Sequence, residues 1–437
     1  MQVMRLEVGR FPVREVVFGS ATAWHDGVLT VDREGVLRTL MSGGLIESVE
    51  LEVAMPGEAV RLWPVRDVVE PMVKVDGPGQ TYPGMCGRPA QMVGSGRTHR
   101  LTNMALVEIS SVGWHDSGHD HVFMFLDMVG PWADVMPYGS LVNLGLVVEP
   151  KSSLPIHEKN QVIHGATLTL SDLLAEAVKE LDPPDVEVFE LSQVASKLPK
   201  VVYLMGLHSP QAMSGSAATF GNATYGRGYL DPPWLIHPNE IFDGAVTGPY
   251  RTGFATSWTM SNNPVLFDLS RRHGRDIEFL GVIVVRTEWT TWAEKELVGK
   301  QAAKLAKMLG ADGALMTWDA GGNEFIEIIR TIEACEQMGI KTVFLTSEDN
   351  SYDGAPTMLE PIPEADAIVS TGFYQAAVQE FPEAPEMNHV IGSQEMPGGS
   401  GLDGPMRKQM MPATARMPVP RRYDDHYGYN NLSAIDY

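Results

Sequence analysis

Cysteine is nearly absent from this sequence, which has only Cys86 and Cys335 among its 437 residues. Two cysteines cannot form a disulfide framework, a cysteine zinc cage or an iron–sulfur cluster. Long hydrophobic runs are missing too, since no stretch approaches the roughly 20 apolar residues of a membrane helix. No apolar stretch typical of a signal peptide follows the first residues. These absences predict a cytoplasmic protein without a membrane anchor.

Positive charge is also scarce. The 33 Lys and Arg residues are outnumbered by 55 Asp and Glu residues, which gives a formal net charge of -22. Such a chain repels the phosphates of nucleic acids and of anionic lipids, so we expect neither a nucleic-acid nor a membrane partner. No phosphate-binding Gly-x-x-x-x-Gly-Lys-Ser/Thr motif occurs, and the segment 94–96 lacks the third glycine of a dinucleotide fingerprint. No nucleotide cofactor is therefore expected.

The hydrophobic pattern changes near residue 150. Residues 1–150 contain short runs of Val, Leu and Ile interrupted by Gly, Pro and Asp, which predicts a β-rich, antiparallel N-terminal domain. Beyond it, buried strands are expected at 201–205, 279–285, 314–317 and 342–346. Amphipathic helices precede Gly310 and Gly339, and a glycine suits the left-handed end of a helix. This alternation predicts an α/β fold with a mostly parallel sheet and helices on both faces.

Two long segments of the second half lack a clear helical or strand pattern. The α/β domain is expected to span 151–394 and to carry a polar, aromatic loop at 206–262, a length that usually indicates function or disorder. Residues 395–437 are rich in Pro, Gly and Met, which predicts an extended arm that is either disordered or wraps a partner. Three tyrosines of the arm suit an interface anchor: Tyr423, Tyr427 and Tyr429.

Polar residues follow several of the predicted strands. Ligands of parallel α/β sheets bind outside the carboxyl ends of the strands, where polar loops begin at Arg286, Trp318 and Ser347. Each loop is equally compatible with ordinary turn chemistry. His208 and His237, both beside turns that contain proline, are candidate catalytic acid/base groups. The alternative is a structural hydrogen bond, which is the commoner role of a histidine at a strand end.

One short segment concentrates histidine. His119 and His121 point to the same face of an extended backbone, and His115 can meet them across a turn at Ser117-Gly118. Three imidazoles, with Asp120 as a supporting partner, would form an open site for zinc or another divalent metal. The alternative is a solvated loop whose histidines bind nothing.

Several separated blocks carry a family likeness. They read GSGRTHRL at 94–101, DMVGP at 127–131, LIHPNEIFDGA at 235–245, NNPV at 262–265, AAKLAKMLGADG at 302–313 and GIKTV at 339–343. In order and spacing, across roughly residues 80–372, the chain resembles the component B subunits of glycine, sarcosine and betaine reductases, which are also related to the D-proline reductase proprotein. The resemblance implies a hetero-oligomeric reductase whose separate thiol or selenol subunit attacks the substrate carbon.

The resemblance also suggests residues that hold the substrate, a small molecule with a carboxylate. In the glycine-rich block, Arg97 and Thr98 are candidate anchors of that carboxylate, and His99 is a catalytic candidate. The alternative is a turn between strands with a salt-bridged arginine. Asn262 and Asn263 of the NNPV block are further candidate substrate-binding residues.

The sequence departs from the family at its cofactor. The resemblance implies self-cleavage before a cysteine, which becomes a pyruvoyl group, but no cysteine lies between Asp243 and Ser261. Ser257 could supply a pyruvoyl group by the same dehydration, and Thr252 or Thr256 a related ketoacyl group. Nothing in the sequence marks any of them as activated. We therefore expect an intact chain without a pyruvoyl group.

Three functions remain open. The preferred one is the substrate-binding subunit of a reductase complex that cleaves a C–N or related C–heteroatom bond. Reducing equivalents would come from a partner, because Cys335 occupies the apolar stripe of a helix, where a thiol is usually inert. The second is a noncatalytic scaffold, and the third is a metal-dependent lyase or hydrolase that uses His115, His119 and His121.

Overall fold

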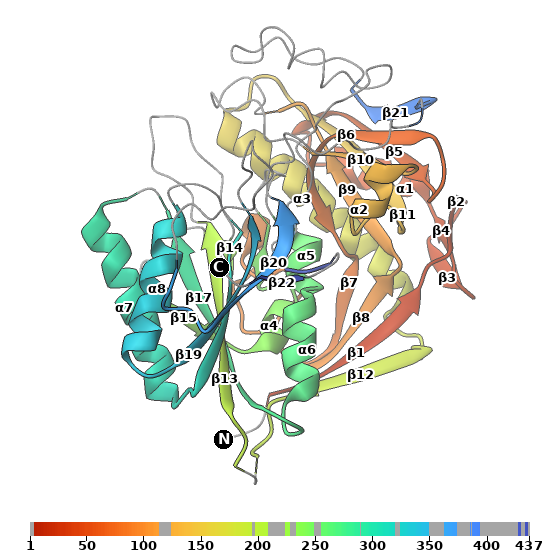
Figure 1. Cartoon of the computed structure of the whole chain (residues 1–437). Helices are drawn as coiled ribbons and strands as arrows, with labels where there is room; N and C mark the ends of the chain where they lie inside the picture. Colours follow the sequence, from red (N-terminus) through yellow and green to blue (C-terminus); the bar gives the residue numbers. More distant parts are fainter. Residues whose placement is uncertain are drawn as a thin grey trace, which may run out of the picture.

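The computed structural model describes residues 4–112, 124–194, 197–208, 223–227, 233–248, 255–288, 290–319, 324–348, 362–373, 385, 387–393, 427–429 and 433–435. Within these ranges, strands pair into sheets of four, six and seven strands and two smaller sheets. The predicted fold class, a β-rich N-terminal part followed by a mostly parallel α/β sheet, is confirmed (Figure 1).

The N-terminal part is built around two mixed sheets. The four-stranded sheet has the order β12 (Asp185–Glu190), β1 (Arg5–Pro12), β8 (Gly96–Thr102) and β7 (Met72–Asp76). The six-stranded sheet has the order β10 (Met124–Asp127), β6 (Val60–Val69), β9 (Met104–Ile109), β11 (Val142–Pro150) and β5 (Ile46–Ala54), and β21 (His389–Gly392) pairs with β6. The pairs β1/β8 and β9/β11 are parallel, so the antiparallel expectation was wrong. Local runs of apolar residues carry no information on strand direction.

Smaller elements complete this part. A three-stranded sheet has the order β2 (Glu15–Phe18), β4 (Val28–Val31) and β3 (Ala23–His25). Helix α1 (Arg33–Met41) begins after Asp32, whose carboxylate accepts a hydrogen bond from the Gly35 N–H at 2.9 Å. Short turns and helices lie at η1 (Met85–Gly87), α2 (Pro131–Val135) and η2 (Glu176–Val178). The longest helix, α3 (Ile156–Ala175), contacts the six-stranded sheet.

The second part is a seven-stranded sheet. Its order is β15 (Trp234–Ile236), β17 (Glu278–Thr287), β13 (Lys200–His208), β18 (Gly313–Thr317), β19 (Lys341–Glu348), β20 (Ala367–Phe373) and β22 (Ser433–Ile435). The five central strands are parallel, whereas β15 and β22 pair antiparallel at the edges. All four strands predicted here are present. A two-stranded sheet joins β14 (Ala223–Thr224) and β16 (Val246–Thr247).

Helices cover both faces of this sheet, as expected. On one face lie α7 (Trp292–Leu309) and α8 (Phe325–Gln337), and on the other α4 (Pro238–Phe242), α5 (Ser257–Ser261) and α6 (Pro264–Arg272) (Figure 1). Successive side chains of β13 alternate between the two cores, with Leu204 packed among α7 and α8 and Tyr203 among α4 to α6. Gly310 ends α7 with a φ of 82°, the left-handed geometry that the sequence predicted.

Three segments that the sequence assigned to the α/β domain pack against the N-terminal sheets. Helix α3, β12 and β21 contact or pair with the N-terminal sheets. Within the predicted arm, β22 pairs with β20, and Tyr427 is only 1% exposed. Tyr427 therefore packs inside its own chain, where no partner can reach it. The position of the domain boundaries stays a prediction.

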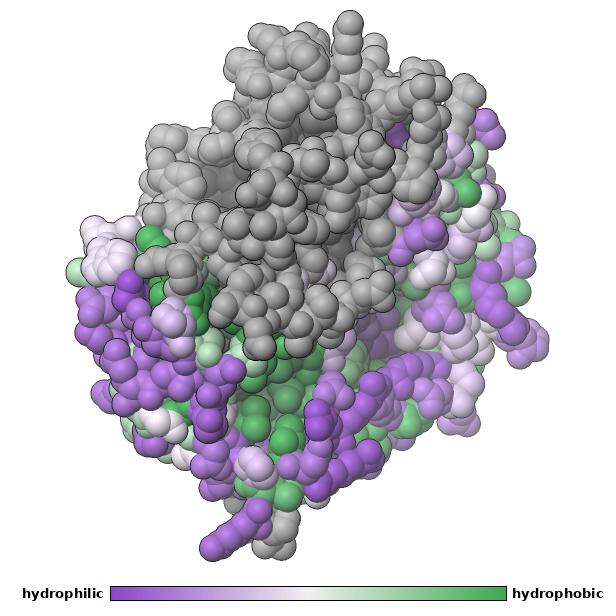
Figure 2. Space-filling model, in the orientation of Figure 1, coloured by the Kyte–Doolittle hydropathy of each residue, from purple (hydrophilic) through white to green (hydrophobic). Residues whose placement is uncertain are grey.

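Hydrophilic side chains cover much of the described surface that Figure 2 shows, around α7 and near β12, with a narrower hydrophobic strip between them. On α7, ion pairs such as Lys300 with Glu296 at 2.5 Å account for part of this surface. No helix within the described ranges is long and apolar enough to cross a membrane.

Candidate active site

The carboxyl ends of the central strands place polar side chains at one edge of the seven-stranded sheet. His208 ends β13 and is paired with Thr287 of β17, while Met205 of β13 is paired with Thr317, the last residue of β18. Strand ends in this register bring His208, Arg286 and Asp319 to the same edge. Ligands of parallel sheets bind at this edge, so it is the first candidate for an active site.

His208 is held by two carboxylates. Its ring atom Nδ1 lies 3.2 Å from Glu324 Oε1, and its backbone N–H donates to Asp319 Oδ1 at 2.9 Å. The side chains of both His208 and Glu324 are buried. A carboxylate beside an imidazole orients the ring, and an imidazole held in this way can act as a general acid or base.

A second group of charges lies where β17 ends. Arg286 donates to the carboxylate of Glu288. The ammonium of Lys295 donates to the Glu288 carbonyl at 2.5 Å and to Glu327 Oε2 at 2.6 Å. Burial raises the pKa of Glu327, and the Lys295 ammonium offsets part of that increase. Two cations thus stand at the same edge as His208, and a guanidinium suits a substrate carboxylate.

The short helix α5 and the turn after it join the two parts of the chain. We call residues 256–263 the α5 junction. From this junction, Asn262 Nδ2 donates to Glu70 Oε2 at 3.2 Å, and Asn263 Nδ2 donates to the Tyr203 hydroxyl at 3.2 Å. Tyr203 in turn bonds Thr317 Oγ1 at 2.6 Å. The two asparagines predicted to bind substrate therefore connect the six-stranded sheet to the strand end beside Asp319.

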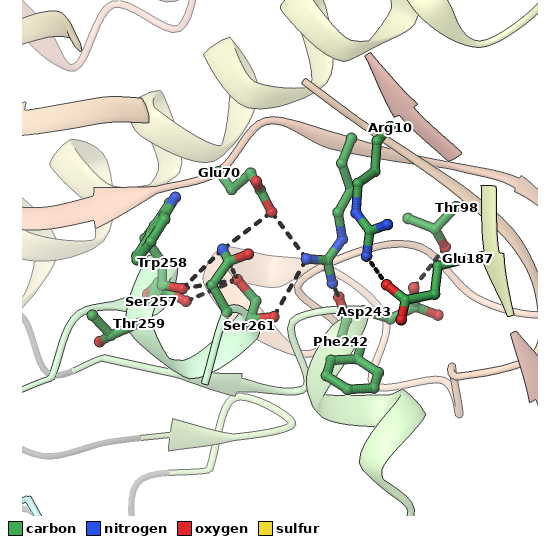
Figure 3. A network of polar contacts seen from close by, with 12 residues as sticks. Arg10, Glu70, Thr98, Glu187, Phe242, Asp243, Ser257, Trp258, Thr259 and Ser261 are labelled. Atoms are coloured by element: carbon green, nitrogen blue, oxygen red, sulfur yellow. Dashed lines mark hydrogen bonds and ion pairs between the residues drawn. The ribbon is translucent and has the colours of Figure 1, made fainter. Parts of the chain in front are cut away.

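Further contacts hold the α5 junction from two sides. The buried Arg100 donates to Glu70 Oε2 at 3.0 Å, to the Ser261 carbonyl at 3.3 Å and to the Phe242 carbonyl. Figure 3 shows Ser257, Trp258, Thr259 and Ser261 of α5 grouped beside Glu70. From the C-terminal segment, the Tyr429 hydroxyl donates to the carbonyls of Thr259 and Asn262 at 2.8 and 2.9 Å.

Asp243 links two blocks that carry the family likeness. Its buried carboxylate accepts hydrogen bonds from Thr98 Oγ1 at 2.6 Å and from the Gly94 N–H at 2.8 Å. Lys74 Nζ forms an ion pair with it at 2.5 Å. Thr98, a predicted substrate-binding residue, is therefore engaged by the protein itself in this structure.

Three other predicted residues make contacts that are structural in kind. Arg97 pairs with Glu7, and His99 Nδ1 donates to the Val178 carbonyl at 2.8 Å. His237 caps α4 by accepting from the Asn239 N–H, and burial lowers its pKa to about 4. A histidine with such a pKa is neutral at pH 7 and is a poor general acid. These contacts favour structural roles, and catalysis by His99 or His237 stays a prediction.

The predicted metal ligands His115, His119 and His121 lie outside the described residues. Among the residues that are described, no group of three or more His, Cys, Asp or Glu side chains is placed to hold a metal ion. Metal binding by the three histidines stays a prediction. Metal analysis of protein purified without added metal should find near-stoichiometric zinc, and less than about a tenth of an equivalent would contradict it.

Some residues of the edge were not singled out from the sequence. The sequence did not indicate Glu324 and Glu327, at the start of α8, or Lys295 of α7, because their contacts with distant residues form only in the folded chain. Lys295 carried a usable signal, since it lies two turns before Ala302 on the buried stripe of α7. A lysine on an apolar stripe is rarely buried without a partner.

The comparison with known proteins agrees with the blocks noted in the sequence. A family model described as glycine/sarcosine/betaine reductase component B subunits matches residues 4–410. The chain belongs to this family. No solved structure matches it.

Relatives from Peptoclostridium acidaminophilum are similar in identity and coverage. The betaine reductase complex component B subunit alpha is 34% identical, with 92% of this chain and 90% of that protein aligned. The corresponding sarcosine reductase subunit alpha is 33% identical, with 89% of each chain aligned. The glycine reductase complex component B subunits alpha and beta are 32% identical, with 92% and 93% aligned. Because the three identities are nearly equal, the comparison does not single out glycine, sarcosine or betaine as the substrate.

The pyruvoyl group that the family likeness implies does not fit the residues present. Cys335 is buried in α8, burial raises its pKa to about 12, and Cys86 lies in η1. Neither is near α5. Ser257 is engaged, because its Oγ donates to Asp67 at 2.6 Å and its N–H donates to the same carboxylate at 2.9 Å. Cleavage before Ser257 would disrupt the first turn of α5, so these contacts favour an intact chain.

We therefore expect the purified protein to be a single uncleaved polypeptide. Intact-mass measurement should give one species near 47.8 kDa. A carbonyl reagent such as a hydrazine should add no mass, because an uncleaved chain has no ketoacyl terminus. Two fragments that divide between residues 244 and 261, one of them labelled by the reagent, would contradict this expectation.

Proposed function

We propose that this chain is the substrate-binding subunit of a cytoplasmic reductase complex that cleaves the C–N bond, or a related C–heteroatom bond, of a small carboxylate. The observation that carries the proposal is the edge of the seven-stranded sheet. There His208, paired with Glu324 at 3.2 Å, shares the strand ends with the cation Arg286. Family membership supports a reductase, and the charges at the edge support the kind of substrate.

Glycine, sarcosine and betaine, which the relatives' names mention, each combine a carboxylate with a positively charged nitrogen. Arg286 is placed to receive the carboxylate by exchanging its contact with Glu288. The carboxylates of Asp319 and Glu324 provide the negative charge that a substrate ammonium requires. The sheet edge thus offers complementary charges for both ends of such a molecule.

The resemblance to the reductase family implies the course of the reaction. A thiolate or selenolate of a separate subunit attacks the substrate carbon, so that a bond from sulfur or selenium to carbon forms while the C–N bond breaks. The bonding pair leaves with the nitrogen. His208 holds a proton at that nitrogen, since an amine departs readily only in protonated form. Burial raises the pKa of the Cys335 thiol to about 12, so the proposed nucleophile is a thiol or selenol of a partner.

Reconstitution tests the proposal. The chain is purified alone and with a candidate thiol or selenol subunit, and both are given a dithiol reductant and glycine, sarcosine or betaine. Released ammonia, methylamine or trimethylamine is measured. We expect release from at least one substrate only when both subunits are present. Stable association without any release would instead support a noncatalytic scaffold, and hydrolytic turnover by the chain alone would support a metal-dependent enzyme.

A further inference from the structure

One buried carboxylate outside the sheet edge is bonded directly to the α5 junction. Asp67 on β6 is fully buried, and its Oδ1 accepts from the Ser257 N–H at 2.9 Å and from the Val68 N–H at 2.8 Å. Its Oδ2 accepts from the Ser257 hydroxyl at 2.6 Å, and that hydroxyl accepts from the Gly248 N–H at 3.0 Å. Asp67 thus fixes both the backbone and the side chain of the first residue of α5.

Charged and titratable groups face Asp67 from the neighbouring elements. From α3, His164 Nδ1 lies 3.8 Å from Asp67 Oδ2 and 3.0 Å from Glu108 Oε2 of β9. The pKa of Asp67 is raised to about 6, because burial and the Glu108 carboxylate raise it by more than His164 and the Ser257 bonds lower it. The Glu108 carboxylate keeps the pKa of His164 above its usual value despite burial. The phenol of Tyr82 also lies in the field of Asp67, and its pKa is raised mainly by burial.

Hydrogen bonds joined by short stretches of chain connect Asp67 to the sheet edge. Ser257 begins α5, and Asn263 at the end of the junction donates to Tyr203 at 3.2 Å. Tyr203 bonds Thr317 at 2.6 Å. Two residues after Thr317, Asp319 accepts the backbone N–H of His208 at 2.9 Å. A shift of α5 therefore acts on the strand end that holds His208.

We propose that Asp67 is a positioning residue for the reaction, and that its ionised carboxylate locks the α5 junction in the arrangement that the His208 site requires. The proposal rests on the proposed function for its catalytic consequence. Hydrogen bonds to an ionised carboxylate are about twice as strong as bonds to a neutral group. Protonation of Asp67 weakens both bonds to Ser257 and loosens the junction, whereas above about pH 6 the lock is complete.

A carboxylate at this position has a cost in folding stability. Because the folded-state pKa of Asp67 lies above the model value of 3.8, the folded chain binds this proton more tightly than the unfolded chain does. The contribution of Asp67 to stability therefore falls as pH rises between these two values. Shifted pKa values of this kind cluster at functional sites, which favours a positioning role for Asp67.

The activity test compares pH profiles of kcat/KM in the reconstituted complex. The unaltered protein should lose about tenfold in kcat/KM as pH falls through about 6. This factor corresponds to the difference in strength between two charge-assisted hydrogen bonds and two neutral ones. Asp67→Asn should show no such decline and should remain near the low-pH value of the unaltered protein throughout. Ser257→Ala should move the decline to higher pH, because a bond that lowers the Asp67 pKa is lost.

Asp172→Asn is the matched control. Partial burial also raises the pKa of Asp172, which lies half-exposed on α3 and pairs with Arg88 at 2.7 Å, but no described contact joins it to the α5 junction. The control should keep the profile of the unaltered protein. A decline near pH 6 that survives in Asp67→Asn would overturn the proposal.

Hydrogen–deuterium exchange of the full chain tests the lock without any activity. After correction for the intrinsic pH dependence of exchange, peptides covering residues 255–263 should exchange about tenfold faster at pH 5 than at pH 7.5. In Asp67→Asn, the same peptides should exchange fast at both pH values. If the exchange rate of these peptides depends on the Asp67 carboxylate as expected but no turnover is found in any complex, the proposed function fails and the lock stands. Exchange that does not change with pH in the unaltered chain overturns the lock itself.

Discussion

Replacing His208 by glutamine is expected to lower kcat/KM for glycine or sarcosine by about 10²–10³-fold in the reconstituted complex. Glutamine retains a hydrogen-bonding side chain but cannot exchange a proton, and it removes the partner of Glu324 at 3.2 Å. The nitrogen of glycine or sarcosine leaves as a neutral amine only if it is still protonated when the C–N bond breaks, and His208 is the group proposed to keep it protonated. Turnover at substrate concentrations above and below KM gives kcat and KM separately, and the loss should fall mainly on kcat.

Betaine provides an internal control for this prediction. Its nitrogen carries three methyl groups and no proton, so it leaves without help from an acid, and His208→Gln should cost much less with betaine than with glycine or sarcosine. His157→Gln serves as the protein control, because His157 is exposed on α3. An equal loss with every substrate would assign His208 to binding or folding, and no loss with any of them would remove it from the site.

The second large effect is expected at Asp243. Replacing it by asparagine leaves the Lys74 ammonium buried without its ion-pair partner at 2.5 Å and disturbs the bonds from Thr98 and Gly94. Breaking a buried pair by removing one partner costs about 3–5 kcal/mol. The midpoint of thermal unfolding should fall by roughly 5–15 °C, which calorimetry or circular dichroism can measure.

A double variant separates lost charge pairing from lost packing at Asp243. Adding Lys74→Met to Asp243→Asn removes the unpaired ammonium and should recover a large part of the lost Tm. Lys300→Met provides the comparison, since Lys300 forms an exposed pair with Glu296 whose loss should shift Tm by no more than about 2 °C. If Asp243→Asn unfolds within 2 °C of the unaltered protein, the pair with Lys74 contributes little to stability.

Features that depend on neighbours in the chain could be predicted from the sequence. Strand β18 and helix α7 were expected from the spacing of their apolar residues, and Gly310 was expected to end α7, as its φ of 82° bears out. The family could also be predicted, because it depends on the order of short blocks and not on their contacts. His208 was singled out as a candidate because it lies beside a strand end and a turn that contains proline, and its catalytic role stays a prediction.

Contacts between residues far apart in the chain were decided only by the tertiary structure. Asp67 bonds Ser257, 190 positions later, and Glu70 bonds Asn262, 192 positions later, so no local pattern indicates either pair. The parallel pairing of β1 with β8 is of the same kind. Glu324 meets His208 because α8 starts next to the carboxyl edge of the sheet. Sequence periodicity reports which face of an element is buried, whereas the partner on that face is selected by packing of the whole chain.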